Sequence, residues 1–153
     1  MNFNNLKEII EFAIEREKEA VSFYEDASAR QEYSDARKMF KDFANEERKH
    51  RALLEGFLKG EKTIVDYQFK WIPDMKRSNY LVDIPYEKGM PYADILRLAM
   101  KREEKSLDLY NKLALEIDDK EMKQIFKVLC QEEAKHKLAL ETLYDDYMAE
   151  MGD

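Results

Sequence analysis

The sequence predicts an all-α protein, a four-helix bundle made of two duplicated antiparallel helix pairs joined by a long crossover. Charged residues make up 39% of the 153 positions, and only 4 Gly and 3 Pro interrupt them. Such a composition favours long helices and is poor in turns. Heptad spacing and an internal repeat are the other two observations. The length suits a single domain, residues 1–153, with helix pairs at 4–59 and 92–149 and the crossover at 61–90.

Four segments carry apolar residues at alternating steps of four and three, the spacing of helices that pack at shallow angles. The helices are expected at residues 4–31, 35–59, 92–116 and 119–149. Ser34 is placed to cap the amino end of the second helix. Asp118, with Glu121 three residues later, is placed to cap the fourth as a weak capping box.

The second half of the chain repeats the first at a distance of 86 residues, without a gap over roughly fifty positions. Matched pairs include Ile9 and Ile95, Tyr24 and Tyr110, Phe40 and Phe126, and Leu54 and Leu140. Two copies are too few for a solenoid, which needs at least three repeats. A duplicated helix pair is the simpler interpretation.

The chain has two histidines, and each ends nearly the same phrase: EERKH at 46–50 and EEAKH at 132–136. Each apolar seam is interrupted near its middle by a glutamate, and in the second and fourth helices a histidine follows three residues later. The six intruding residues are Glu17, Glu47, His50, Glu103, Glu133 and His136. Counting at 1.5 Å per residue from the turn near Gln31 and Ser34 puts the first two glutamates about 21 and 20 Å along their helices. The second half repeats this spacing, so all six are expected in one layer.

Buried carboxylates are costly unless they are paired or bind a metal. One Glu from each of two helices, with Glu-x-x-His from each of the other two, is the ligand set of dinuclear carboxylate bundles. A single Glu-x-x-His on a charged helix is usually a solvated face, but the matched set across the repeat argues for a site. We therefore expect these six residues to be both the metal ligands and the catalytic residues. Carboxylate and imidazole ligands suit two Fe ions, with Mn or Zn as substitutes.

Two tyrosines near the expected ligands have an open role. Tyr24 and Tyr110 each follow a seam glutamate by seven residues. They fit core aromatics as well as hydrogen-bond donors to the ligand carboxylates. Glu46 and Glu132 lie off the seam and are expected at the surface.

Residues 61–90 fit no heptad and are too long for a turn. Their aromatic residues indicate either a packed strap or a surface that faces a partner: Tyr67, Phe69, Trp71 and Tyr80.

Charge and composition exclude several classes of protein. The net charge is −7, with both signs interleaved, so no basic patch for nucleic acid is expected. The start of the chain has no signal-peptide pattern, and no apolar run reaches membrane-spanning length. Cys130 is the single cysteine, which precludes an internal disulfide and favours the cytoplasm.

The phrases AIEREKEAVSFY with FANEERKH, and AMKREEKSLDLY with LCQEEAKH, resemble the rubrerythrin branch of the ferritin-like superfamily across all four helices. The resemblance implies a di-iron site that oxidises Fe(II) and reduces O2 or H2O2 in oxidative-stress defence, commonly in a homodimer. Rubrerythrins also carry a rubredoxin-like domain with paired CxxC motifs. Since this chain has one cysteine, its electron donor is expected to be an external, rubredoxin-like protein.

Rubrerythrins place an extra glutamate one turn after the ligand of the third helix, where this chain has Ser106. The four Glu and two His that remain are closer to the set of bacterioferritin-type centres, which puts rubrerythrin-style peroxidase chemistry in question. Three hypotheses follow: a di-iron oxidoreductase, a protein that binds or sequesters iron with little turnover, and a bundle whose site has lost its function. The complete ligand set weighs against the third.

Overall fold

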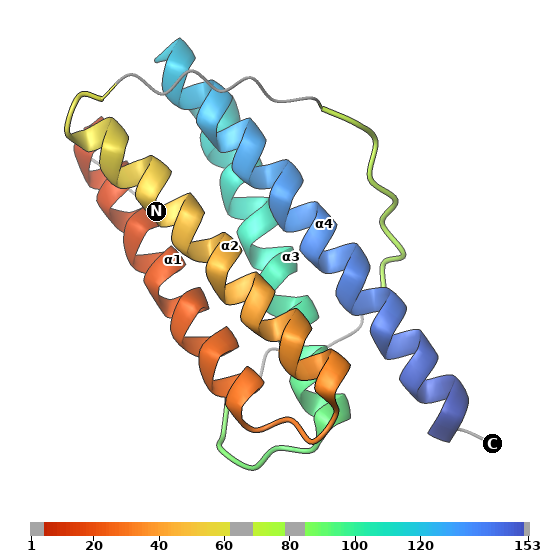
Figure 1. Cartoon of the computed structure of the whole chain (residues 1–153). Helices are drawn as coiled ribbons and strands as arrows, with labels where there is room; N and C mark the ends of the chain where they lie inside the picture. Colours follow the sequence, from red (N-terminus) through yellow and green to blue (C-terminus); the bar gives the residue numbers. More distant parts are fainter. Residues whose placement is uncertain (1–4, 62–68, 79–84, 152–153) are drawn as a thin grey trace. The chain divides into compact units, whose positions relative to one another are not determined.

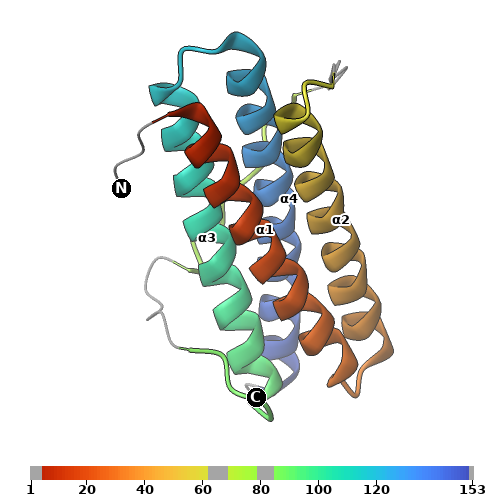
Figure 2. The ribbon, with the colours of Figure 1, turned by 90° about the vertical axis from the view of Figure 1, so that its left-hand side faces the viewer.

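The computed structural model describes residues 5–61, 69–78 and 85–151, and in these residues it contains four helices and no strand. The helices are α1 (Leu6–Ala29), α2 (Ser34–Leu58), α3 (Tyr92–Glu116) and α4 (Lys120–Met151). The chain divides into two compact units, Met1–Asp66 and Tyr67–Asp153, each containing one helix pair. Within each pair the two helices run antiparallel (Figures 1 and 2). The predicted helices are thus all present, with ends within two residues of the expected ones.

The helix ends differ from prediction at two caps. Ser34 is the first residue of α2, and Tyr33 occupies the cap position, where its side chain makes no capping hydrogen bond to the helix. Asp119 replaces Asp118 at the start of α4, because its Oδ1 accepts a hydrogen bond from the Met122 amide at 2.8 Å. Asn5 caps α1 in the same way, through a 2.9 Å bond from the Glu8 amide. Each side-chain oxygen satisfies an amide that the first helical turn leaves without a partner.

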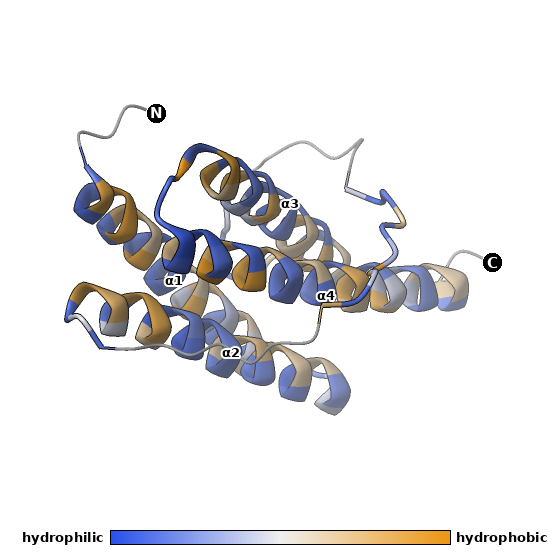
Figure 3. Cartoon of the chain, turned by 90° about the horizontal axis from the view of Figure 1, so that it is seen from above, coloured by the Kyte–Doolittle hydropathy of each residue, from blue (hydrophilic) through white to orange (hydrophobic). Residues whose placement is uncertain are grey.

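Apolar and polar residues alternate around the helices (Figure 3), as expected for helices that bury one face. The buried apolar positions follow the predicted seams in both units. Tyr24 stacks on Phe40 with ring centroids 6.0 Å apart and an interplanar angle of 22°. Tyr110 stacks on Phe126 at 5.8 Å and 21°. The repeat of 86 residues is therefore a repeat of packing geometry as well as of sequence.

Part of the crossover packs along α4, and we call its described central part, residues 69–78, the strap. Gln131 binds the backbone of Lys70, accepting its N–H at 3.0 Å and donating to its carbonyl. Further along, Arg77 binds Asp145 through its guanidinium, with Nε 2.9 Å from Oδ1. The fourteen residues from Gln131 to Asp145 rise roughly 21 Å. Seven strap residues span roughly 23 Å when extended, so the strap is an extended chain that runs beside the helix.

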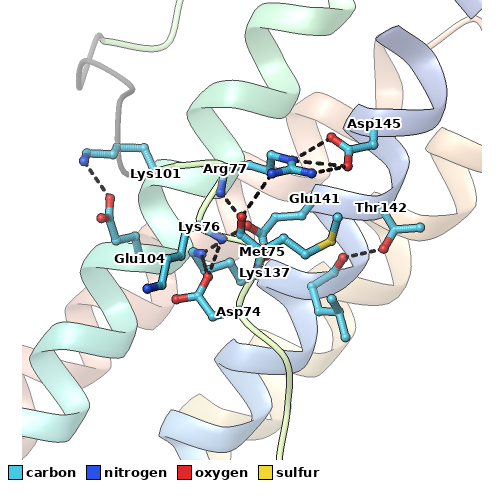
Figure 4. Close-up of polar contacts among 11 residues, drawn as sticks. Asp74, Met75, Lys76, Arg77, Lys101, Glu104, Lys137, Glu141, Thr142 and Asp145 are labelled. Atoms are coloured by element: carbon cyan, nitrogen blue, oxygen red, sulfur yellow. Dashed lines mark hydrogen bonds and ion pairs between the residues drawn. The ribbon is translucent and has the colours of Figure 1, made fainter. Parts of the chain in front are cut away.

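Glu141 of α4 is the main anchor of the strap (Figure 4). Its two carboxylate oxygens accept the backbone N–H groups of Met75, at 3.3 Å, and Arg77, at 2.7 Å. Lys137 lies one turn earlier on α4. Its Nζ donates hydrogen bonds to Glu141 Oε2 at 3.3 Å and to Asp74 Oδ1 at 2.5 Å. Lys137 and Glu141 are both buried. The backbone of residues 69–78 is therefore packed as a strap, whereas the two described aromatic residues, Phe69 and Trp71, are 47% and 84% exposed, so a role for them in facing a partner stays open. Tyr67 and Tyr80 lie outside the described residues.

Removing this anchor is expected to free the strap. Glu141→Ala deletes two hydrogen bonds to a charged acceptor and leaves Lys137 buried beside Asp74 alone, so we expect a loss of about 2–4 kcal/mol in unfolding free energy. Denaturant titration measures the loss, and hydrogen exchange at the Met75 and Arg77 amides locates it. The control is Glu150→Ala, an exposed position on the same helix. Unchanged exchange at the two amides in Glu141→Ala would contradict this role.

None of the helices in the described residues has the apolar length that crossing a membrane requires.

Candidate metal centre

The first unit holds a buried cluster of two carboxylates and one imidazole. His50 Nδ1 lies 3.7 Å from Glu17 Oε1 and 3.7 Å from Glu47 Oε2. All three side chains are buried. Each can offer one ligand atom, and these atoms lie within 4.8 Å of one another.

Helix geometry explains why these three residues meet. Glu47 and His50 are three residues apart on α2 and so point from the same face. Glu17 comes from the facing side of α1, at the matching height of an antiparallel partner. Fully buried alanines next to the cluster, Ala13 and Ala44, leave little bulk between the two helices. Ligand atoms from two helices can therefore approach within the span of a single metal ion.

The second unit repeats this cluster. His136 Nδ1 lies 3.6 Å from Glu103 Oε1, and Glu133 belongs to the same group, with ligand atoms within 4.8 Å of one another. All three side chains are buried. The set again combines one glutamate from the first helix of the pair with Glu-x-x-His from the second. Each unit thus provides two carboxylates and one imidazole, a hard-to-borderline donor set without thiolate.

Protonation equilibria in the first cluster are strongly displaced. Burial, with the negative charge of nearby Glu47, raises the pKa of Glu17 to about 8. Burial acts to lower the pKa of His50, but hydrogen bonds with Glu17 and Glu47 and their charges outweigh it. The pKa of His50 consequently lies well above its usual value. Without a metal, the cluster holds protons at neutral pH, and a divalent cation can take their place.

The structure places all six predicted ligands in two buried clusters of three, one in each unit. Their meeting in one layer stays a prediction. Glu46 and Glu132 are partly exposed and form ion pairs with Lys49, at 3.4 Å, and Lys135, at 2.9 Å, as expected of residues off the seam. Ser106 is half-buried one turn after Glu103. Tyr24 and Tyr110 pack as core aromatics, and a role as donors to the ligands stays a prediction.

Sequence reasoning missed the buried Lys137 and Glu141, which follow His136 on α4. A lysine and a glutamate four residues apart on a charged helix ordinarily form a solvated pair. The repeat does not indicate this burial, because Arg51 and Glu55 occupy the same positions in the first half and their side chains are 40% and 38% exposed. Lys137 and Glu141 are buried because the strap, which has no periodic pattern, packs on them.

Comparisons with known proteins agree with this architecture. The ferritin-like domain family matches residues 6–145. A hypothetical protein from Pyrococcus furiosus is 27% identical, with a TM-score of 0.68, over 93% of this chain and 89% of that one. A crystal structure described as a candidate ferritin-like diiron-carboxylate protein, from Thermotoga maritima, is 21% identical with a TM-score of 0.68, over 91% and 93% of the two chains. A comparison with curated proteins found no match.

Proposed function

Since the chain belongs to the ferritin-like domain family, and its all-α ferritin-like fold class is thereby confirmed, we propose that it is a non-haem di-iron carboxylate oxidoreductase. In this proposal it oxidises Fe(II) and reduces O2 or H2O2, with an external protein as electron donor. One observation carries the proposal: each unit buries the same Glu plus Glu-x-x-His cluster. The two clusters contain, in type and number, the residues of the ligand set of dinuclear carboxylate bundles.

The residues present fit two iron ions. Four carboxylates balance the charge of two divalent cations, and two imidazoles complete the set of six protein ligands. Bound iron supplies two electrons, enough to convert one hydrogen peroxide into two waters or one oxygen into hydrogen peroxide. Glu17 and His50 hold protons in the metal-free protein and release them when their oxygen and nitrogen atoms become ligands. The stacked rings of Tyr24 and Phe40, and of Tyr110 and Phe126, fill the core about two helical turns from each cluster.

Metal stoichiometry tests this proposal directly. We expect about two Fe ions per chain after anaerobic loading, and protons released during loading at pH 7, because the cluster exchanges protons for metal. Elemental analysis and titration in weak buffer measure the two quantities. Glu47→Gln is expected to lower the stoichiometry, whereas Glu19→Gln, at an exposed position on α1, serves as the matched control. One ion per chain at saturation, or equal losses in the two variants, would contradict a dinuclear site.

Turnover separates the proposed oxidoreductase from a protein that only sequesters iron. An oxidoreductase consumes many equivalents of oxidant when a chemical reductant resets the site. A sequestering protein stops after one. Ser106 bears on the oxidant, because a neutral hydroxyl stands where the resemblance to rubrerythrins places a glutamate. We therefore favour oxygen-reactive chemistry over a specialised peroxidase.

A further inference from the structure

The strap is bound to α4 on both sides of the two expected ligands of that helix. Gln131, which binds the backbone of the strap, lies two residues before Glu133. Lys137, which pairs with an aspartate of the strap, directly follows His136. Glu141, one turn later, holds two backbone amides of the strap (Figure 4). The turn of α4 that carries both ligands is therefore fixed between bonds to a second segment of the chain.

The corresponding part of α2 is held differently. The residues 86 positions before these anchors are Asn45, Arg51 and Glu55. Asn45 accepts a hydrogen bond from Arg48 of the same helix at 2.7 Å, and Arg51 Nε lies 2.6 Å from Glu55 Oε1. The side chains of Arg51 and Glu55 are 40% and 38% exposed, against 4% and 0% for the pair under the strap. The repeat has thus kept the ligands in both halves, whereas the bracing of the helix behind them differs.

This difference affects how much order each cluster has before a metal ion binds. A helical segment that is packed and hydrogen-bonded on its outer side opens less readily than one whose outer side chains are half-exposed. Ordering ligand side chains during binding costs free energy, and a cluster on a braced segment avoids part of that cost. The ligands of α4 therefore need less ordering than those of α2.

We propose that the strap preorganises the two α4 ligands of the second cluster, so that this cluster binds the first metal ion and the first cluster binds the second. The second cluster is Glu103, Glu133 and His136, and the first is Glu17, Glu47 and His50. Gln131, Lys137 and Glu141 are positioning residues, since they act through the helix and not as ligands. The inference rests on the proposed function, because it requires both clusters to bind metal.

The two histidines report on the two clusters separately, because the chain has only two and each cluster contains one. Metal-free protein labelled with ¹⁵N in its histidine side chains is titrated with Zn²⁺, and the imidazole signals are followed by NMR. The variants His50→Gln and His136→Gln assign the signals. We expect the His136 signals to change with the first equivalent and the His50 signals with the second, for a difference of about tenfold in dissociation constant.

Release of the strap should remove this order. Glu141→Ala is expected to weaken Zn²⁺ binding at His136 about fivefold and to leave binding at His50 unchanged. Glu55→Ala makes the same change at the matching position of α2 and should leave the order as it is. Because Glu141→Ala also destabilises the fold, Asp74→Asn is the second variant. It weakens the bond between the strap and Lys137 without changing α4, and it should shift the order in the same direction.

The outcomes distinguish this inference from the proposed function. Two bound ions with both imidazoles changing together, or with His50 changing first, would overturn the inference and leave the proposed function intact. Equal weakening at both histidines in Glu141→Ala, or the same effect in Glu55→Ala, would reveal a general loss of stability and would also overturn it. If neither imidazole responds to Zn²⁺, the clusters are not metal sites, and the proposed function fails together with the inference.

Discussion

Glu17→Leu is expected to stabilise the metal-free protein at pH 8 by about 1–4 kcal/mol, because proton linkage makes a carboxyl group with a raised folded-state pKa costly at that pH. The side chain is buried, and its pKa is raised to about 8 by burial and by the charge of Glu47. Near pH 8 the folded protein must either bury this charge or hold a proton that the unfolded chain has released. Leucine removes that cost while filling the same space.

The raised pKa of Glu17 also determines how the stability of the metal-free protein changes with pH. Between pH 4.5 and about 8 the folded state binds more protons at Glu17 than the unfolded state does, so stability falls as pH rises, by at most about 1.4 kcal/mol per unit. The raised pKa of His50 acts in the same direction. The stabilisation that His50 contributes is fully present below pH 6.5, the usual pKa of the side chain, and is lost as pH rises through its folded-state pKa. Glu17→Leu should therefore flatten the stability profile between pH 5 and 8.

Thermal melting of chelator-treated protein across this pH range measures both effects. Glu19→Leu, at an exposed position on α1, is the control and should leave the slope unchanged. The same Glu17→Leu protein should lose dinuclear iron binding, because the substitution removes a ligand carboxylate. A Glu17→Leu variant that melts well below the unmodified metal-free protein at pH 8 would show that the position is not strained.

The heptad seams and the repeat were sufficient to predict the helices and the clusters. An intruding glutamate such as Glu17 is conspicuous in an apolar seam, and the spacing of Glu133 and His136 forces both to one face. These features depend on local periodicity, which a sequence displays directly. The six predicted ligands are accordingly buried in two groups of matching composition.

Features that depend on contacts between distant segments could not be predicted in this way. The burial of Lys137 and Glu141 is decided by the strap, which is more than sixty residues away in the sequence and has no regular pattern. The predicted capping residue of α4 was wrong for a related reason, since Asp118 and Asp119 are chemically equivalent candidates. Only the backbone path chooses between them, and it selects Asp119.

Ser106→Glu is expected to shift the oxidant preference of the diferrous protein toward peroxide by at least about tenfold, a change of roughly 1.4 kcal/mol in relative barrier heights. Ser106 is half-buried one turn after Glu103 on α3, so both side chains project from one side of the helix. A hydroxyl there is a neutral and weak ligand, whereas a carboxylate adds a negative charge beside the proposed centre. The resemblance to rubrerythrins, which have a glutamate at this position, gives the direction of the change.

Stopped-flow oxidation of the diferrous forms with O2 and with H2O2 gives the ratio of the two rate constants for each variant. The unmodified protein should react readily with O2 and show no strong preference for peroxide. Leu115→Glu makes the same change in charge at an exposed position on α3, and its ratio should match the unmodified protein. If the unmodified protein already reacts orders of magnitude faster with peroxide, a neutral residue at Ser106 does not limit peroxide chemistry. A peroxidase would then be the better description of the proposed centre.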